Sequence, residues 1–237
     1  MPAAPNSQVF LFLSRILGKK MRDSEGRVRG KIVDLGIALA DLYPPVISLY
    51  YLPAGSKIPA RLPWSQVAWA DDRILLSSSP AQEPPDRPPG EGELLLKESL
   101  LDKQIVDTHG AKILRVNDLH LLKVNHKLFL IHVDVGFRGL MRRVGWERAM
   151  DKFFQWFFDY RLADNLIPWR FVQPLSSPQL LRLKVAQNRL SLLHPADLAD
   201  IIEELDINKR TEVFQALDVE TAAEALLVRL AQRGIDH

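Results

Sequence analysis

Two histidines and two aspartates of one expected hairpin carry side chains that can bind a transition metal. The hairpin turns at Asn125-His126, and if Val124 pairs with Leu128, the two histidines lie opposite each other, as do the two aspartates. Imidazole nitrogens and carboxylate oxygens on one sheet face are ligands for Zn²⁺ or Mn²⁺. The alternative is a polar outer face, on which cross-strand polar pairs are common. The four candidate ligands are Asp118, His120, His132 and Asp134.

The sequence shows no pattern of residues that is typical of an enzyme. It lacks the G-x-S-x-G nucleophile motif, a glycine loop that would cradle phosphate, and the H-E-x-x-H metal motif. It has no cysteine, and its scattered serines suggest no arrangement of a nucleophile with a base. We therefore expect a protein without enzymatic activity.

Composition indicates a cytoplasmic protein with two kinds of surface. Residues 1–193 carry 27 basic and 19 acidic side chains, whereas residues 194–237 carry 4 basic and 10 acidic ones. An acidic tail on a basic body favours different partners for each, with cations a candidate for the tail. The absence of cysteine fits a reducing compartment. No signal peptide and no transmembrane segment is expected, so any contact with the inner face of a membrane would be made through a partner.

The part of the sequence that positions these residues is an internal repeat with two copies. Residues 17–52 match a second copy 84 positions later, as in Asp23/Asp107 and Asp34/Asp118, and the match resumes at a shift of 105 with Trp64/Trp169. The difference corresponds to an insertion of 21 residues in the second copy. Since the first copy has an aspartate at 34 but no histidines, the pattern favours a structural role for Asp118.

Short strands separated by turns predict that each copy is a small β-barrel or a strongly bent sheet. In the first copy we expect strands at 19–22, 28–39, 46–52, 61–70 and 73–77, with a tight turn at residues 23–26. In the second copy we expect a turn at 107–110, a hairpin of strands 112–122 and 128–135, and a strand at 166–172. The first domain is placed at 9–79, a proline-rich linker at 80–93, and the second domain at 94–190.

The inserted segment, about residues 146–163, has the spacing of a helix. Its aromatic surface is wider than one stripe, so the helix either lies between domains or presents aromatic side chains to a partner or a membrane interface. The candidate partner-binding residues are Phe154, Trp156 and Phe158. Arginines around this segment, such as Arg142 and Arg148, offer contacts to RNA, anionic lipid or the acidic tail.

The acidic tail, residues 191–237, predicts short stacked helices. A helix starts at His194-Pro195, because proline at an early helical position loses no hydrogen bond. The dipeptide Leu-Asp recurs at 205–206 and 217–218, which sets helical units of about twelve residues. The expected fold class is therefore mixed β and α, with two duplicated β-barrels and a C-terminal fragment of an α-helical superhelix.

The two copies resemble PRC-barrel domains, small β-barrels found in the H subunit of the photosynthetic reaction centre and in a ribosome-maturation factor. The resemblance rests on Leu17-Gly18-Lys19, the Asp-Ser-Glu-Gly turn, Gly30-Lys31-Ile32-Val33-Asp34, and the strands at Leu62-Pro63-Trp64 and Ile167-Pro168-Trp169. It implies that each copy is a small β-barrel, and the ribosome-maturation relative implies an RNA- or ribosome-associated adaptor as an alternative function.

The tail resembles the N-terminal intracellular domain of MgtE-type magnesium transporters. The matching residues are His194-Pro195-Ala196-Asp197-Leu198-Ala199, Glu203-Glu204-Leu205 and Ala222-Ala223-Glu224-Ala225-Leu226. In that family the helical domain lies beside CBS domains, and acidic side chains of both bind Mg²⁺ in the closed, inhibited state. The resemblance implies that Glu224 is a Mg²⁺ ligand. No CBS domain follows in this sequence, so the facing ligands would come from CBS domains or a membrane transporter, in cis or in trans.

We therefore expect a cytosolic regulatory or scaffolding module that senses or responds to divalent cations, Mg²⁺ above all. The alternative is an RNA- or ribosome-associated adaptor that uses the barrels, although a net charge of only +2 disfavours nucleic-acid binding. A third reading is a structural adaptor without a ligand.

Overall fold

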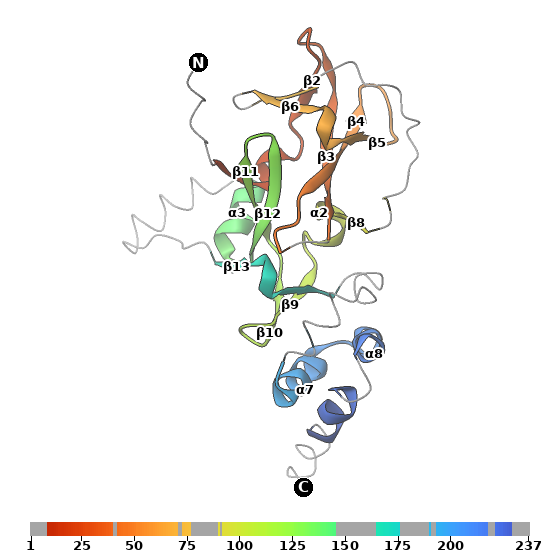
Figure 1. Cartoon of the computed structure of the whole chain (residues 1–237), viewed down its shortest axis with the longest axis vertical. Coiled ribbons are helices and arrows are strands. Elements are labelled where there is room, and N and C mark those ends of the chain that lie inside the picture. Colours follow the sequence, from red (N-terminus) through yellow and green to blue (C-terminus); the bar gives the residue numbers. More distant parts are fainter. Residues whose placement is uncertain are drawn as a thin grey trace, which may run out of the picture. The chain divides into compact units, whose positions relative to one another are not determined.

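The computed structural model describes residues 9–39, 42–70, 73–76, 90, 92–145, 165–175, 190, 193–217 and 221–228 (Figure 1). The chain forms two compact units. The first contains Met1–Leu101 and Asn117–Trp169, and the second contains Asp102–Val116 and Arg170–His237. The second repeat thus contributes residues to both units. No helix in the described ranges is long and apolar enough to cross a membrane.

A seven-stranded sheet forms the larger part of the first unit. Its longest strand is β3, in which buried Ile32, Leu35 and Ile37 face the core. β3 pairs with β2, β4 and β8, and the order along the sheet is β5-β4-β3-β2-β7-β6, with β8 on β3. The strands are β2 (Lys20–Arg22), β3 (Val28–Ala38), β4 (Val46–Pro53), β5 (Ala60–Pro63), β6 (Val67–Ala70), β7 (Arg73–Leu76) and β8 (Glu93–Leu95).

A four-stranded sheet of order β1-β11-β12-β13 completes the sheets of the first unit. Leu119, Leu121 and Val133 of its central hairpin are fully buried. The two sheets of this unit are linked where Pro45 bridges to Phe129 and the Trp64 indole donates to the carbonyl of His126 at 2.9 Å. The strands are β1 (Val9–Phe12), β11 (Asp118–Val124), β12 (Lys127–Asp134) and β13 (Leu166–Pro168).

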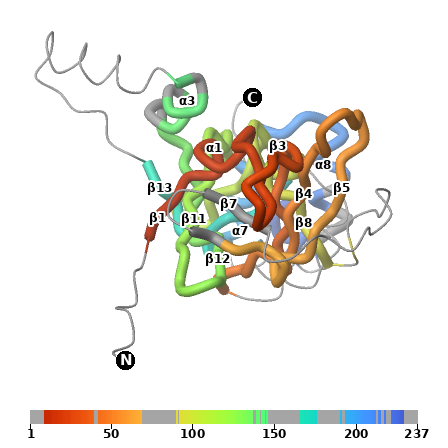
Figure 2. Tube along the Cα trace, turned by 90° about the horizontal axis from the view of Figure 1, so that it is seen from above, coloured from red at the N-terminus to blue at the C-terminus, as the bar shows by residue number. Residues whose placement is uncertain are grey.

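The first strand of each repeat pairs with a strand of the other repeat. β1 pairs antiparallel with β11, with Phe12 opposite His120. β8 pairs antiparallel with β3, with Leu95 opposite Gly36. His120 and Gly36 are 84 residues apart, and their partners Phe12 and Leu95 are 83 apart, so the two pairings correspond to within one residue. The repeats therefore exchange their first strands; the placement of β1 beside β11 is visible in Figure 2.

The first unit also contains two short helices and one longer helix. α1 (Leu13–Ile16) follows β1, α2 (Leu96–Ser99) follows β8, and Leu13, Ile16 and Leu96 are buried. α3 (Phe137–Val144) follows β12 and contacts α1 and β11. It lies between β12 and β13, N-terminal to the inserted segment at 146–163.

The second unit combines a three-stranded sheet with helices. The sheet order is β10-β9-β14, from β9 (Gln104–Asp107), β10 (Lys112–Arg115) and β14 (Val172–Pro174). The helices are α7 (Pro195–Glu204), α8 (Ile207–Ala216) and residues 221–228. They share one buried cluster with the sheet: Val106, Leu175, Leu190, Leu193, Leu198, Ile201, Ile202, Leu205, Val213, Leu217 and Ala225.

The expected mixed fold is confirmed, but closed barrels are not what the described residues form. The two sheets of the first unit and the sheet of the second unit are all open. A barrel needs the first and last strands of one repeat in one sheet. Here the exchange places β1 and β8 in the sheets of the opposite repeats, and β9, β10 and β14 form a sheet apart from β11–β13.

The expected strand at 112–122 is also corrected, because it is two strands in different sheets. β10 ends at Arg115 and β11 begins at Asp118. Between them, Val116 donates to the carbonyl of Lys103 at 2.9 Å, while Asn117 donates to the carbonyl of Asp134 at 2.8 Å. The backbone N–H groups of these neighbouring residues therefore bond to different segments, and the strand is divided between them.

Other local expectations are confirmed. The 3-10 turns Trp64–Gln66 and Trp169–Phe171 lie 105 residues apart, as the repeat requires. α7 begins at Pro195 and ends before Leu205, and α8 begins after Asp206. The inserted segment at 146–163, with Phe154, Trp156 and Phe158, lies outside the described residues, as does nearly all of the linker.

Candidate functional site

The β11–β12 hairpin brings the four expected ligands together in pairs. Asp118 lies opposite Asp134 and His120 opposite His132, as expected. The pairing near the turn differs by one residue, because Val124 faces Lys127 rather than Leu128. A bulge between His120 and Leu121 absorbs the difference. Asn125 takes a positive φ of 55° in the turn, a conformation that asparagine adopts more readily than most residues.

The two aspartates are buried beneath α3 and are not on a solvent-exposed face. Both have 0% exposure, and Arg142 of α3 reaches between them with 2% side-chain exposure. Its Nη1 lies 3.1 Å from Oδ2 of Asp134 and 3.4 Å from Oδ2 of Asp118. The guanidinium also lies 3.3 Å from the ring centroid of Phe12. Burial raises the pKa of Asp118, and the bonds from Ser14, Leu119 and Arg142 oppose that rise.

Two glycines allow α3 to lie close to the carboxylate of Asp134. A Cβ at Gly139 would lie 2.5 Å from Oδ2 of Asp134, and one at Gly136 would lie 3.2 Å from its Oδ1. The backbone N–H of Gly136 donates to Oδ1 of Asp134 at 2.9 Å. The helix is therefore anchored on the carboxylate of Asp134 from two sides, and a side chain at position 139 would move it away.

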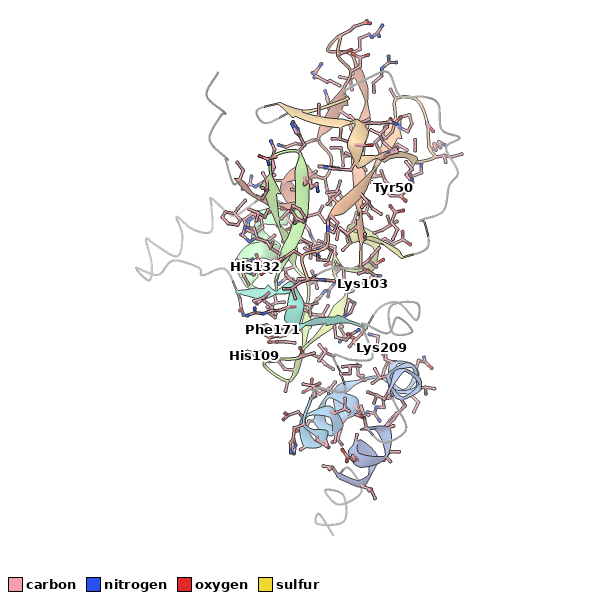
Figure 3. All side chains as sticks on the ribbon, in the orientation of Figure 1. Tyr50, Lys103, His109, His132, Phe171 and Lys209 are labelled. Atoms are coloured by element: carbon pink, nitrogen blue, oxygen red, sulfur yellow. The ribbon has the colours of Figure 1, made fainter. Side chains whose placement is uncertain are left out.

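The two histidines form a separate pair from the aspartates. Their Nδ1 atoms are 3.4 Å apart, and the rings are 5.5 Å apart between centroids. On the other side, the ring of His120 stacks on Phe12 at 4.7 Å and on Phe10 at 5.1 Å. Both imidazoles are half-buried, and burial lowers the pKa of His132, which Figure 3 labels on β12.

This arrangement differs from a four-ligand metal site. The carboxylates are directed to Arg142, and the imidazoles to each other. Among the described residues, no group of three or more His, Asp or Glu side chains is arranged to hold a metal ion. The structural role expected for Asp118 fits its bonds to Ser14, whose N–H and Oγ donate to it at 3.1 Å and 2.6 Å.

A second buried polar cluster occupies the corresponding place in the first repeat, and sequence reasoning missed it. Glu93 of β8, with 1% side-chain exposure, pairs with Arg61 at 3.1 Å. It also accepts bonds from the hydroxyls of Ser48 and Tyr50 and from the N–H of Gly90. Burial alone would raise the pKa of Glu93, but the bonds from Ser48, Gly90 and Arg61 lower it overall. No local sequence motif predicts this cluster, because its members come from three strands and a loop.

Glu224 lies in the second unit, on the helix of residues 221–228, and its side chain is exposed. Ala225 next to it is 1% exposed and packs into the helical core, which leaves Glu224 on the outer side. Leu226 and Leu227 beside it are 43% and 66% exposed. Further exposed carboxylates of this unit are Asp197, Asp200, Glu203, Glu204 and Asp206.

Comparison with known proteins supports the reading of the tail. No curated protein matches the chain. The family model that matches is that of the MgtE intracellular N domain, over residues 193–228. This range contains α7, α8 and the helix that bears Glu224. Residues 193–228 are therefore similar to the intracellular N domain of the MgtE magnesium-transporter family.

Proposed function

We propose that this chain is a non-enzymatic regulatory or scaffolding module that responds to Mg²⁺ and docks on CBS domains or on a membrane transporter, in cis or in trans. The observation that carries the proposal is the family match over residues 193–228 together with the exposed side chain of Glu224 within it. The duplicated body, with its PRC-type sequence marks, would serve as the scaffold that holds the helical tail.

The exposure of Glu224 supports a shared cation site. Mg²⁺ is held by oxygen ligands, keeps several of its waters, and needs only one or two carboxylates of the protein. An exposed carboxylate can supply one ligand while a docked partner supplies the others. The exposed Leu226 and Leu227 next to it offer apolar surface to the same partner.

The proposed mechanism is a population shift between docked and undocked states. Without the cation, the acidic surface of the tail repels acidic side chains of a partner. A bridging Mg²⁺ neutralises Glu224 and the facing carboxylates, so it binds the docked state more tightly and favours it. The size of the shift is set by the ratio of the cation's affinities for the two states.

A Mg²⁺ titration of the whole chain by calorimetry and thermal unfolding tests the proposal. We expect binding in the millimolar range, and stabilisation of about 1.4 kcal/mol when Mg²⁺ is in tenfold excess over its dissociation constant. Glu224→Ala should abolish it. Glu204→Ala, which removes another exposed carboxylate of the same unit, is the matched control and should retain it.

Titrations with Ca²⁺ and Mn²⁺ measure which cation the site prefers. A titration with KCl at matched ionic strength measures the effect of charge screening alone, which is then subtracted. If wild type binds Mg²⁺ and Glu224→Ala binds it equally well, the proposed site is wrong.

A further inference from the structure

The facing histidines of the β11–β12 hairpin have a geometry that a hydrogen bond explains poorly. Their Nδ1 atoms are 3.4 Å apart. Hydrogen bonds from N–H groups in proteins usually span about 2.7–3.2 Å, so a direct bond between these nitrogens is long and weak. Only one of two neutral imidazoles can donate in such a contact, and two protonated rings would repel each other.

The same distance suits two ligands of one metal ion. With metal–nitrogen bonds of about 2.0–2.1 Å and a tetrahedral angle at the metal, two ligand nitrogens lie about 3.3 Å apart. We propose that His120 and His132 form a two-histidine site for a borderline transition-metal ion, Zn²⁺ or Cu²⁺. Each histidine binds the ion through its Nδ1 atom. This site is distinct from the carboxylate site proposed for Mg²⁺.

The surroundings hold the ring of His120 in place before any metal binds. The residues lie directly opposite each other on paired strands. The ring of His120 is stacked on Phe12 and Phe10, with interplanar angles of 19° and 29°. A ring fixed in this way loses little conformational entropy on binding, which favours affinity.

Burial also favours the neutral imidazole that binds metal, because it lowers the pKa of His132. Asp118 and Asp134 lie two residues away along the same strands, with Arg142 between them.

The remaining coordination positions belong to water. Asp118 and Asp134 are directed to Arg142, so the hairpin supplies two nitrogen ligands. Such a site is open and binds more weakly than a closed structural zinc centre. By the general order of affinities of divalent metals, Cu²⁺ should bind more tightly than Zn²⁺ or Ni²⁺.

The test is calorimetric titration of the full chain, stripped with a chelator and dialysed, with Zn²⁺ and then Cu²⁺. We expect one ion per chain with micromolar affinity. His120→Gln and His132→Gln should each weaken binding at least tenfold. His126→Gln is the matched control, because this residue is exposed in the turn of the same hairpin, and it should bind as wild type does.

Paramagnetic resonance of the Cu²⁺ complex of the unmutated chain gives a second readout that needs no variant. Hyperfine splitting from two equivalent nitrogens is expected. The absence of saturable binding would overturn the proposal, as would equal affinity in all three variants or splitting from a single nitrogen. Glu224→Ala should bind Zn²⁺ unchanged, which separates this site from the Mg²⁺ site.

Discussion

Asp34 and Asp118 are equivalent residues of the two repeats, and each holds the short helix that the opposite repeat contributes. Oδ1 of Asp118 accepts the N–H of Ser14 in α1 at 3.1 Å. Oδ1 of Asp34 accepts the N–H of Lys97 in α2 at 2.7 Å. Each carboxylate also accepts the N–H of the next residue in its own strand, at 2.9 Å and 2.7 Å. The two aspartates thus fasten the strand exchange from both sides.

Removing either carboxylate should destabilise the first unit, and removing Asp118 should cost more. Asp34→Ala leaves two part-buried N–H groups of α2, those of Lys97 and Glu98, without this acceptor, which costs about 1–3 kcal/mol. Asp118→Ala also removes one of the two carboxylates that Arg142 faces, and breaking a buried ion pair costs about 3–5 kcal/mol. Urea unfolding of the full chain measures both.

Two variants calibrate this comparison. Ser14→Ala removes only the hydroxyl bond to Asp118, so a loss of about 1 kcal/mol is expected. Glu25→Ala removes an exposed partner of Arg27 and should change the free energy of unfolding by less than about 1 kcal/mol. Equal losses for Asp34→Ala and Asp118→Ala would show that Arg142 draws no stability from Asp118.

The exchanged strands should hold the two repeats together after the chain is cut between them. A protease-cleavable sequence inserted within residues 80–89 allows the cut to be made in the folded protein. Leu13, Ile16, Leu96 and Leu100 belong to the exchanged segments and are at most 1% exposed, and each contributes about 1.5–3 kcal/mol by burial. We expect the two fragments to co-elute in size-exclusion chromatography and to separate only in denaturant. Separation in native buffer would contradict the exchange.

Acid should weaken the turn at residues 23–26 through Asp23. Burial alone would raise the pKa of this carboxyl, but bonds from the side chain and backbone of Arg27 and from the N–H of Glu25 lower it to about 2. Because the folded pKa lies below the ordinary value of 3.8, the carboxylate stabilises the fold above about pH 4 and loses this effect as the pH falls toward 2.

Urea unfolding of wild type and Asp23→Asn at a series of pH values measures this effect. The advantage of wild type over Asp23→Asn should shrink between about pH 4 and pH 2. Glu25→Gln, an exposed carboxylate of the same turn, controls for the general loss of a negative charge. Parallel profiles for wild type and Asp23→Asn would contradict the prediction.

The helices of the second unit should depend on the strand β9. Val106 is 0% exposed and belongs to the same buried cluster as α7 and α8. Val106→Ala removes two methyl groups from this cluster and should cost about 2 kcal/mol. The loss should appear as faster amide hydrogen exchange in α7 and α8, whereas the exposed Lys112→Ala in β10 should have no effect. Unchanged exchange in the helices would show that they fold independently of the sheet.

Local features of this fold could be predicted from sequence because they depend on neighbouring residues. The turn at residues 23–26 follows from an aspartate that accepts backbone bonds and a glycine at φ 79°. The start of α7 follows from Pro195, and that of α8 from Asp206, whose side chain accepts the N–H groups of Asn208 and Lys209. The pairing of His120 with His132 was expected from the hairpin, but it depends on a bulge after His120 that the sequence did not predict.

The tertiary structure alone decided which strands pair across the repeats and which charges meet. Alternation along a strand gives the face of each side chain but does not name the neighbouring strand, so β1 on β11 and β8 on β3 were not predictable. For the same reason nothing in the sequence indicated that Arg142 lies between Asp118 and Asp134 and pairs with both carboxylates. The duplication, the candidate ligands and the acidic tail were determined by the sequence itself. The partners of these residues lie far away in the chain. Bringing such segments together costs loop-closure entropy, and only packing in the folded state selects which segments meet.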